Sequence, residues 1–252
     1  MKKTFLITAI ASVESLNDEH NYNKAYFLVG EDRRCKACKY KSFEDKKRCV
    51  GAGILLGHLL KIARAIDKNG DLKEAQGLLN VDLTKAMASY DISYNYKVIA
   101  HDNEKPYFVD YPELYFNISH SGKFVVCTLS DADVGVDIEG GRDADLRVAE
   151  RFFKDSEVKM IKEALSDEEK NNLFFKFWTM KEACVKLTGI GIARGLKEIQ
   201  YPELNENRMF NSRRWKKQSD GQTEILSENK WNDIFGISGR EAWQIRRSVC
   251  LS

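Results

Sequence analysis

The sequence lacks any long run of apolar residues. No stretch approaches the roughly 20 apolar residues that a membrane-spanning helix requires, so we expect no membrane partner. It also lacks an excess of charge of either sign, because 40 Lys and Arg residues face 38 Asp and Glu residues and leave a formal net charge of +2. This balance does not favour bulk binding to nucleic acid or to a membrane surface. Any recognition by charge must therefore be local.

The sequence also lacks a paired cysteine framework. A chain of 252 residues is long enough to bury a core without disulfides, and scattered cysteines are typical of a reducing, cytoplasmic protein. The start of the sequence imitates a short signal peptide, with the basic segment Met1 to Lys3 followed by the apolar Phe5 to Ala11. A buried first strand over residues 4–12 explains the same residues. The six cysteines are Cys35, Cys38, Cys49, Cys127, Cys184 and Cys250.

Hydrophobic periodicity predicts an α+β fold. Residues 44–65 carry apolar side chains at three- and four-residue intervals, which predicts a long helix with one face in the core. The remaining predicted elements are strands at 96–100, 114–118, 124–129, 134–138 and 242–251, and helices at 145–163 and 167–187. A long helix beside short strands occurs twice. We therefore predict two similar halves, residues 1–130 and 131–252, each a small antiparallel sheet packed against a long helix.

Two carboxylates stand two residues apart in an otherwise apolar strand, at Asp137 and Glu139. Residues i and i+2 of a strand point to the same face. Like charges held together in this way repel unless a cation compensates them, and a hard divalent ion is the usual partner. The alternative is a strand end that runs into solvent.

The predicted helix over residues 167–187 contains Trp178, Glu182 and Lys186 at four-residue spacing, so an aromatic ring, a carboxylate and an ammonium group share one stripe. Glu182 and Lys186 could be a surface ion pair worth about 0.3 to 0.5 kcal/mol. A third carboxylate beside Asp137 and Glu139 would instead give Mg²⁺ three oxygen ligands.

Phe116 to Gly122 read as a strand that ends in a turn rich in hydroxyl and imidazole groups. Adjacent strand residues face opposite ways, which argues against Ser119 and His120 as a nucleophile and its base. Contact with a phosphate or a ribose, or a capped turn, fits these residues better.

A run of basic residues covers positions 33–41, and more basic residues open the first predicted helix. The run could hold a phosphate or form a solvated face. Cys35 and Cys38 make one Cys-x-x-Cys, but a zinc site needs a second pair of ligands. A second basic cluster at 213–217 is read as a solvated turn.

Together these segments resemble the phosphopantetheinyl transferase superfamily. Its signature has two parts, Gly-(Ile/Val)-Asp-x-Glu and then Trp-(Ser/Thr)-x-Lys-Glu-(Ala/Ser)-x-x-Lys. The first part matches Gly135 to Glu139, and the second matches Trp178 to Lys186. The segment Asn117 to Gly122, upstream of both, adds to the resemblance. The length is similar to that of the surfactin-type (Sfp-type) branch. That likeness implies a pseudo-symmetric monomer with the active site in the cleft between its two halves.

The resemblance implies a set of site residues. Asp137, Glu139 and Glu182 would hold Mg²⁺, and Glu182 and Lys186 would act in catalysis. The residues implied to contact coenzyme A are Arg33, Lys36, Arg48, Lys105, Ser119, His120, Lys181 and Lys186. Glu104 departs from the family pattern, which has Gly before the Lys-Pro pair.

The implied reaction transfers the 4′-phosphopantetheine group from coenzyme A to a serine hydroxyl of an acyl or peptidyl carrier protein and releases adenosine 3′,5′-bisphosphate. The main alternative is a non-catalytic member of the fold that binds coenzyme A or a carrier protein. Two further hypotheses are a Ser-His hydrolase built on Ser119 or Ser121 with His120, and a zinc-binding protein built around Cys35 and Cys38.

Overall fold

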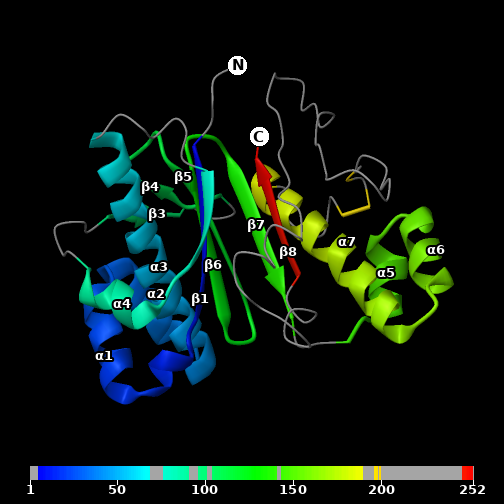
Figure 1. Cartoon of the computed structure of the whole chain (residues 1–252), viewed down its shortest axis with the longest axis horizontal. Helices are drawn as coiled ribbons and strands as arrows, with labels where there is room; N and C mark the ends of the chain where they lie inside the picture. Colours follow the sequence, from blue (N-terminus) through cyan, green and yellow to red (C-terminus); the bar gives the residue numbers. More distant parts are fainter. Residues whose placement is uncertain are drawn as a thin grey trace. The chain divides into compact units, whose positions relative to one another are not determined.

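The structure is a computed structural model that describes residues 5–68, 76–90, 96–100, 104–140, 143–189, 196, 197, 199 and 246–251. These residues form a mixed α+β fold, as predicted (Figure 1). No helix among them is long and apolar enough to span a bilayer. The basic cluster at 213–217 lies outside the described residues.

The first elements of the chain are β1 (Leu6–Ser12), the 3₁₀ helix η1 (Glu14–Asn17), α1 (Glu19–Leu28), α2 (Glu31–Lys39), α3 (Phe43–Lys68), β2 (Gln76–Asn80), α4 (Leu83–Ala88), β3 (Val98–Ile99), β4 (Tyr107–Phe108), β5 (Tyr115–Ser121) and β6 (Phe124–Ser130). They are followed by β7 (Val134–Glu139), α5 (Leu146–Phe152), α6 (Asp155–Glu163), α7 (Asp167–Thr188) and β8 (Arg246–Leu251).

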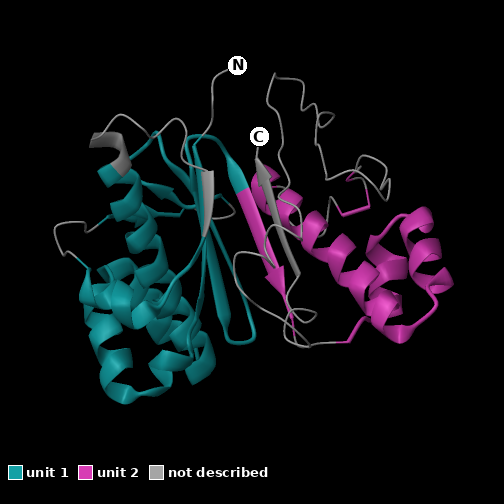
Figure 2. Ribbon diagram, in the orientation of Figure 1, with its two compact units in different colours: residues 1–134 teal, residues 135–252 magenta. Residues whose placement is uncertain are grey.

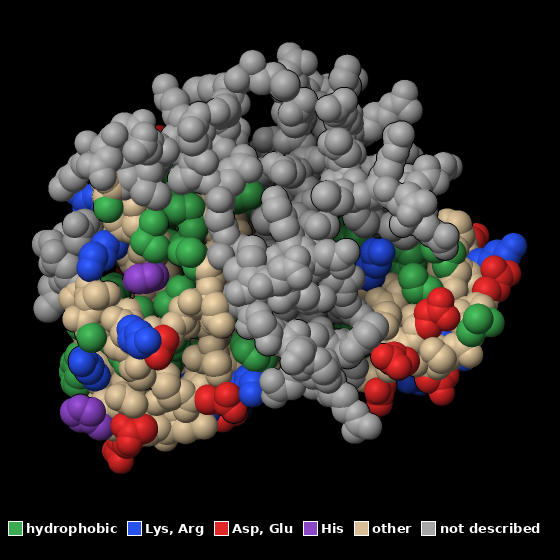
Figure 3. Space-filling model, in the orientation of Figure 1, with side chains coloured by type: hydrophobic (Ala, Val, Ile, Leu, Met, Phe, Trp, Pro, Cys, Tyr) green, Lys and Arg blue, Asp and Glu red, His purple; other side chains and the backbone are tan. Residues whose placement is uncertain are grey.

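The chain divides into two compact units, residues 1–134 and 135–252 (Figure 2). On the face that Figure 3 shows, acidic and basic side chains are interspersed over the described surface of each unit. The near-neutral net charge of the chain leads one to expect this mixture. The predicted domains 1–130 and 131–252, and the likeness between them, stay predictions.

The first unit contains a four-stranded sheet in the order β2-β1-β6-β5. β6 is antiparallel to both of its neighbours, but β2 runs parallel to β1, with Leu6 opposite Gln76. The prediction of a purely antiparallel sheet is therefore wrong at this edge. A parallel neighbour requires a crossover connection, and the helical segment from α1 to α3 supplies it.

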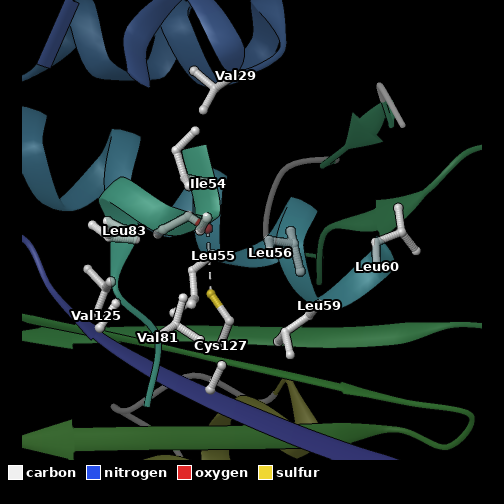
Figure 4. Packing of buried hydrophobic residues seen from close by; sticks show 14 of the residues in the cluster. Val29, Ile54, Leu55, Leu56, Leu59, Leu60, Val81, Leu83, Val125 and Cys127 are labelled. Carbon is white, nitrogen blue, oxygen red and sulfur yellow. Dashed lines mark hydrogen bonds between the residues drawn. The ribbon is translucent and has the colours of Figure 1, made fainter. Parts of the chain in front are cut away.

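The helix α3 packs on this sheet and forms the centre of the core of the first unit. Its apolar side chains recur at three- and four-residue intervals, and Ile54, Leu55 and Leu59 are fully buried. In Figure 4, Leu55 and Leu59 lie between α3 and the strands, where the Cys127 thiol donates to the Ala52 carbonyl oxygen at 3.6 Å. The predicted helix over 44–65 is confirmed and extends a little further at both ends.

In the second unit, β7 pairs with β8, and α7 packs against β8. The prediction of one helix over 145–163 is wrong, because α5 ends at Phe152 and α6 begins at Asp155. Phe153 and Lys154 between them have extended backbone. The Phe153 ring is buried in the core, and the Lys154 N–H donates to the Glu157 carboxylate at 2.8 Å to cap α6.

The segment before α3 contains the helices α1 and α2. The N-cap residue of α1 is Asp18, whose carboxylate accepts from the Asn21 N–H at 2.8 Å. The basic run lies in α2, which has acidic residues in its first turn and basic residues in its last. This order of charges suits the dipole of a helix.

Candidate active site

The strand β7 and the helix α7 approach each other closely at Gly135. A Cβ atom at this position would stand 2.1 Å from the Ala183 carbonyl oxygen and 2.6 Å from the Leu187 nitrogen. Only a residue without a side chain allows the helix backbone to lie directly on the strand. The glycine thereby lets the end of β7 face the last turns of α7.

An ion pair joins the two elements at this approach. Lys186 Nζ donates to Asp137 Oδ1 at 2.6 Å, and the two side chains are 28% and 5% exposed, respectively. The sequence suggested Glu182 as a surface partner for Lys186, whereas the structure pairs the lysine with the strand carboxylate. The pair is mostly shielded from water, so its charges interact more strongly than an exposed pair would.

Glu182 lies one helical turn before Lys186 and is only 7% exposed. Its Oε1 atom is buried without a hydrogen-bond partner. The pKa of Glu182 is raised to about 7, mainly by burial and next by the negative charge of Asp137, while Lys186 acts to lower it and Glu139 adds a smaller increase. Asp137 and Glu139 therefore lie within electrostatic range of Glu182, and Lys186 pairs with Asp137 beside them.

The side chains as they stand do not form a closed metal cage. Within the ranges that the structure describes, no three His, Cys, Asp or Glu side chains are grouped closely enough to hold a metal ion. Lys186 instead supplies positive charge to Asp137. The chemistry of the group nevertheless fits a hard cation, since Glu182 offers an unused carboxylate oxygen in a locally negative environment.

Lys181, the residue before Glu182 in α7, pairs with a carboxylate of α6. It is fully buried, with Nζ 3.0 Å from Glu157 Oε2 and donating to the Leu196 carbonyl oxygen at 2.7 Å. Its ammonium group also lies 5.6 Å from the centre of the Phe153 ring. The predicted phosphate contact of Lys181 stays a prediction, and this buried pairing argues against it. The pairing ties α7 to the first turn of α6.

An aromatic cluster holds α7 against α5 and the segment after it. The Trp178 ring stacks on Phe174, with centroids 6.1 Å apart and planes 7° apart, and also lies near Phe152 and Phe153. Trp178 is half-buried and Glu182 is buried, so this stripe of α7 is not fully exposed.

Three of the basic residues implied in coenzyme A binding, Arg33, Lys36 and Arg48, lie in the first unit on α2 and α3, which pack on each other. Burial lowers the pKa of Lys36, and the nearby charge of Arg33 lowers it further. Burial raises the pKa of Tyr40, whereas the charges of Arg33 and Arg48 both act to lower it. Arg48 also donates to the Gly122 carbonyl oxygen at 2.8 Å. Three cationic side chains therefore surround one region of this unit.

The other predicted contacts lie on the same unit. Ser119 is buried and His120 is exposed on β5, which continues through Ser121. Because neighbouring residues of a continuous strand face opposite sides, His120 does not share a face with either serine, which argues against the hydrolase. Lys105 Nζ lies 3.0 Å from Asp133 Oδ1.

Two features of the site were missed in the sequence. Gly135 was noted only as part of a motif, although its lack of a side chain sets the contact between β7 and α7. Glu157 was not singled out, yet it both caps α6 and pairs with Lys181. The usual capping signature could not have marked Glu157, because the N-cap residue three positions before it is Lys154 and not Ser, Thr, Asp or Asn.

Comparison with known proteins agrees with this arrangement. Residues 133–235, which include β7 and α7, match the 4′-phosphopantetheinyl transferase superfamily. The chain is 37% identical over 179 residues to the 4′-phosphopantetheinyl transferase Sfp of Bacillus subtilis, an alignment that covers 71% of this chain and 67% of that protein. The chain belongs to the 4′-phosphopantetheinyl transferase superfamily.

Other relatives share shorter segments. The psf-1 transferase of Bacillus pumilus is 32% identical over 172 residues, which are 68% of this chain and 63% of that protein. The gsp transferase of Aneurinibacillus migulanus is 33% identical over 138 residues, or 54% of this chain and 51% of that protein. The alignments thus span between about half and two thirds of these relatives.

Proposed function

We propose that this chain transfers the 4′-phosphopantetheine group from coenzyme A to a serine hydroxyl of an acyl or peptidyl carrier protein and releases adenosine 3′,5′-bisphosphate. The observation that carries the proposal is the Glu182 carboxylate, whose pKa is raised first by burial and then by the charges of Asp137 and Glu139, and which lies one turn from Lys186. Membership of the family supports the reaction class.

Asp137, Glu139 and Glu182 are the residues proposed to hold Mg²⁺. The fit rests on the excess of negative charge at Glu182 and on the oxygen donors that a hard cation prefers. When bound, Mg²⁺ supplies positive charge that offsets the carboxylates and stabilises the phosphoryl oxygens that gain charge as the bond to coenzyme A breaks.

The chain's own groups supply the proton transfers and part of the electrostatic stabilisation. Glu182 is the proposed base for the serine hydroxyl, since a buried carboxylate with a raised pKa accepts a proton near neutral pH. Lys186 is already directed at the carboxylates by its bond to Asp137. It is proposed to donate to a phosphate oxygen or to the leaving group.

The first unit is proposed to hold the nucleotide end of coenzyme A. Arg33, Lys36 and Arg48 supply local positive charge suited to a phosphate, in a chain whose net charge is only +2. Ser119, His120 and Lys105 are proposed as further contacts. Carrier proteins are generally acidic, so local basic groups also favour their approach.

The test is the intact mass of a purified apo carrier protein after incubation with the chain, coenzyme A and Mg²⁺. We expect the carrier to gain the mass of one phosphopantetheine group, and EDTA to abolish the gain. The Asp137→Asn variant should lose the gain, whereas Lys162→Met, which alters an exposed ion pair of α6, should keep it. Binding of coenzyme A without a mass gain on fatty-acid, polyketide or peptide-synthetase carriers would instead favour the non-catalytic alternative.

A further inference from the structure

The helix α2 presents two thiols on one exposed face. Cys35 and Cys38 are three residues apart, both are exposed, and neither forms a disulfide. Residues at this spacing are neighbours on a helix surface. Ala37, between them in sequence, is the residue of this helix that is buried, so the thiols lie away from the packed side.

The position of α2 is held by contacts other than the thiol pair. Arg34 Nη1 donates to the Val29 carbonyl oxygen at 2.7 Å, which joins α2 to the end of α1. On its inner side, the buried Cys49 thiol of α3 donates to the Arg33 carbonyl oxygen at 3.8 Å. The two exposed thiols are therefore displayed on an anchored helix.

Cys38 also has a polar neighbour on α1. Its sulfur lies 3.2 Å from the Tyr26 hydroxyl oxygen, within hydrogen-bond distance. The Tyr26 hydroxyl thus gives the Cys38 sulfur a polar neighbour on its exposed side, where small molecules can reach it. Because no third His, Cys, Asp or Glu side chain joins the pair among the described residues, a closed zinc site does not account for it.

The helix geometry is compatible with a disulfide. Cα atoms three residues apart in an α-helix are separated by about 5 Å, inside the roughly 4.4 to 6.8 Å found in disulfides. Their Cβ atoms, about 5 to 6 Å apart, must approach by about 1 Å or more. Cys38 lies in the last turn of α2, where backbone carbonyls have no partner within the helix and the chain can adjust.

We propose that Cys35 and Cys38 form a thiol-disulfide exchange site for low-molecular-weight disulfides. One thiolate attacks the small disulfide, forms a mixed disulfide with the chain and releases one small thiol. The second cysteine then attacks the chain's sulfur in that mixed disulfide and releases the other small thiol. Both cysteines are oxidised, one small disulfide is reduced to two thiols, and the two cysteine protons pass to the released thiolates.

The strain of closing the bridge makes it easy to reduce again. The site is independent of the proposed transferase reaction, since neither cysteine belongs to the residues assigned to it. It does lie on the helix that carries Arg33 and Lys36. The thiol state of α2 is therefore connected to the region proposed to bind coenzyme A.

The experiment uses the full chain in buffers with a graded ratio of glutathione disulfide to glutathione. Remaining thiols are trapped with N-ethylmaleimide after denaturation, and cleavage after acidic residues releases the peptide 33–44, which contains Cys35 and Cys38 but no other cysteine. We expect both labels on this peptide to disappear together, with no glutathione retained, while buried Cys49 and Cys127 remain labelled.

The single variants decide whether the two thiols act as a pair. With Cys38→Ser, the mixed disulfide on Cys35 has no resolving thiol, so the peptide should retain one glutathione. Cys35→Ser should retain it on Cys38. The proposal is overturned if the wild-type peptide accumulates two separate glutathione adducts, or if both thiols stay as fully labelled as Cys49.

Discussion

Lys186 Nζ lies 2.6 Å from Asp137 Oδ1 and so connects the last turns of α7 to the carboxylate strand β7. The lysine is the cationic partner of a group that otherwise contains three carboxylates. Its ammonium group compensates the charge of the strand carboxylate, and the same lysine is the one proposed to donate to a phosphate oxygen or to the leaving group.

Loss of this lysine should destabilise the metal-free chain. Lys186→Met leaves the mostly buried Asp137 without its ion pair, and we expect a loss of about 1–3 kcal/mol in the free energy of unfolding. Mg²⁺ should restore part of it. The matched control is Lys162→Met, because Lys162 and Glu150 are both about half exposed and their pair should contribute about 0–1 kcal/mol. Denaturant unfolding with and without Mg²⁺ measures both, and equal losses would contradict the expectation.

The raised pKa of Glu182 predicts a pH dependence of stability. Its pKa is about 7 in the fold, against an ordinary value of 4.5 for a glutamate side chain, so the folded chain in the absence of Mg²⁺ binds the proton more tightly than the unfolded chain. The resulting stabilisation is complete below pH 4.5 and is lost as the pH rises through about 7. Thermal unfolding in EDTA should show this loss, and Glu182→Gln should flatten it. An unchanged slope in the variant would contradict the assignment.

Gly135→Ala should damage the fold of the second unit. The new Cβ would lie 2.1 Å from the backbone oxygen of Ala183, which cannot rotate away as a side chain can. We expect a loss of at least about 1–3 kcal/mol in the free energy of unfolding. Gly30→Ala is the control, since its Cβ would meet the Tyr96 carbonyl oxygen at 3.7 Å, an ordinary contact. Comparable unfolding midpoints for the two variants would contradict the close approach of β7 to α7 at Gly135.

The buried pair of Lys181 and Glu157 predicts coupled losses. Lys181→Met should cost several kcal/mol, about 3–5 for a fully buried pair, because it leaves Glu157 buried without its cation. The double variant Lys181→Met with Glu157→Leu should recover part of this loss. A double-mutant cycle on unfolding free energies measures the coupling. If Lys181→Met weakened coenzyme A binding without loss of stability, the lysine would be a phosphate contact instead.

Oxidation of α2 should weaken coenzyme A binding if both proposals hold. Lys36 stands between the two exposed cysteines, and closing a bridge moves the backbone that carries it. Losing one charged contact of about 1.4 kcal/mol raises the dissociation constant about tenfold. Calorimetric titration of the oxidised and reduced chain measures this ratio. A variant with both Cys35→Ser and Cys38→Ser, treated with the same oxidant, should bind as the reduced chain does.

The sequence by itself determined the strongly periodic elements and the family. The long α3 and α7 were predictable because their apolar residues recur at the helical period, and β1, β6 and β7 because short apolar runs are typical of buried strands. The motif residues of β7 and α7 pointed to carboxylate chemistry because their types and spacing can be read without coordinates.

Only the tertiary structure decided which partners these residues take. The spacing in the sequence suggested Glu182 as the ion-pair partner of Lys186. The close approach of β7 to α7 at Gly135 makes Asp137 its ion-pair partner instead. Spacing also placed Lys181 beside Glu182 in the chain, whereas the rotation of the helix buries it against Glu157. Likewise, β2 runs parallel to β1 because helices connect them. Each of these contacts joins residues distant in sequence, and local patterns carry no information about such neighbours.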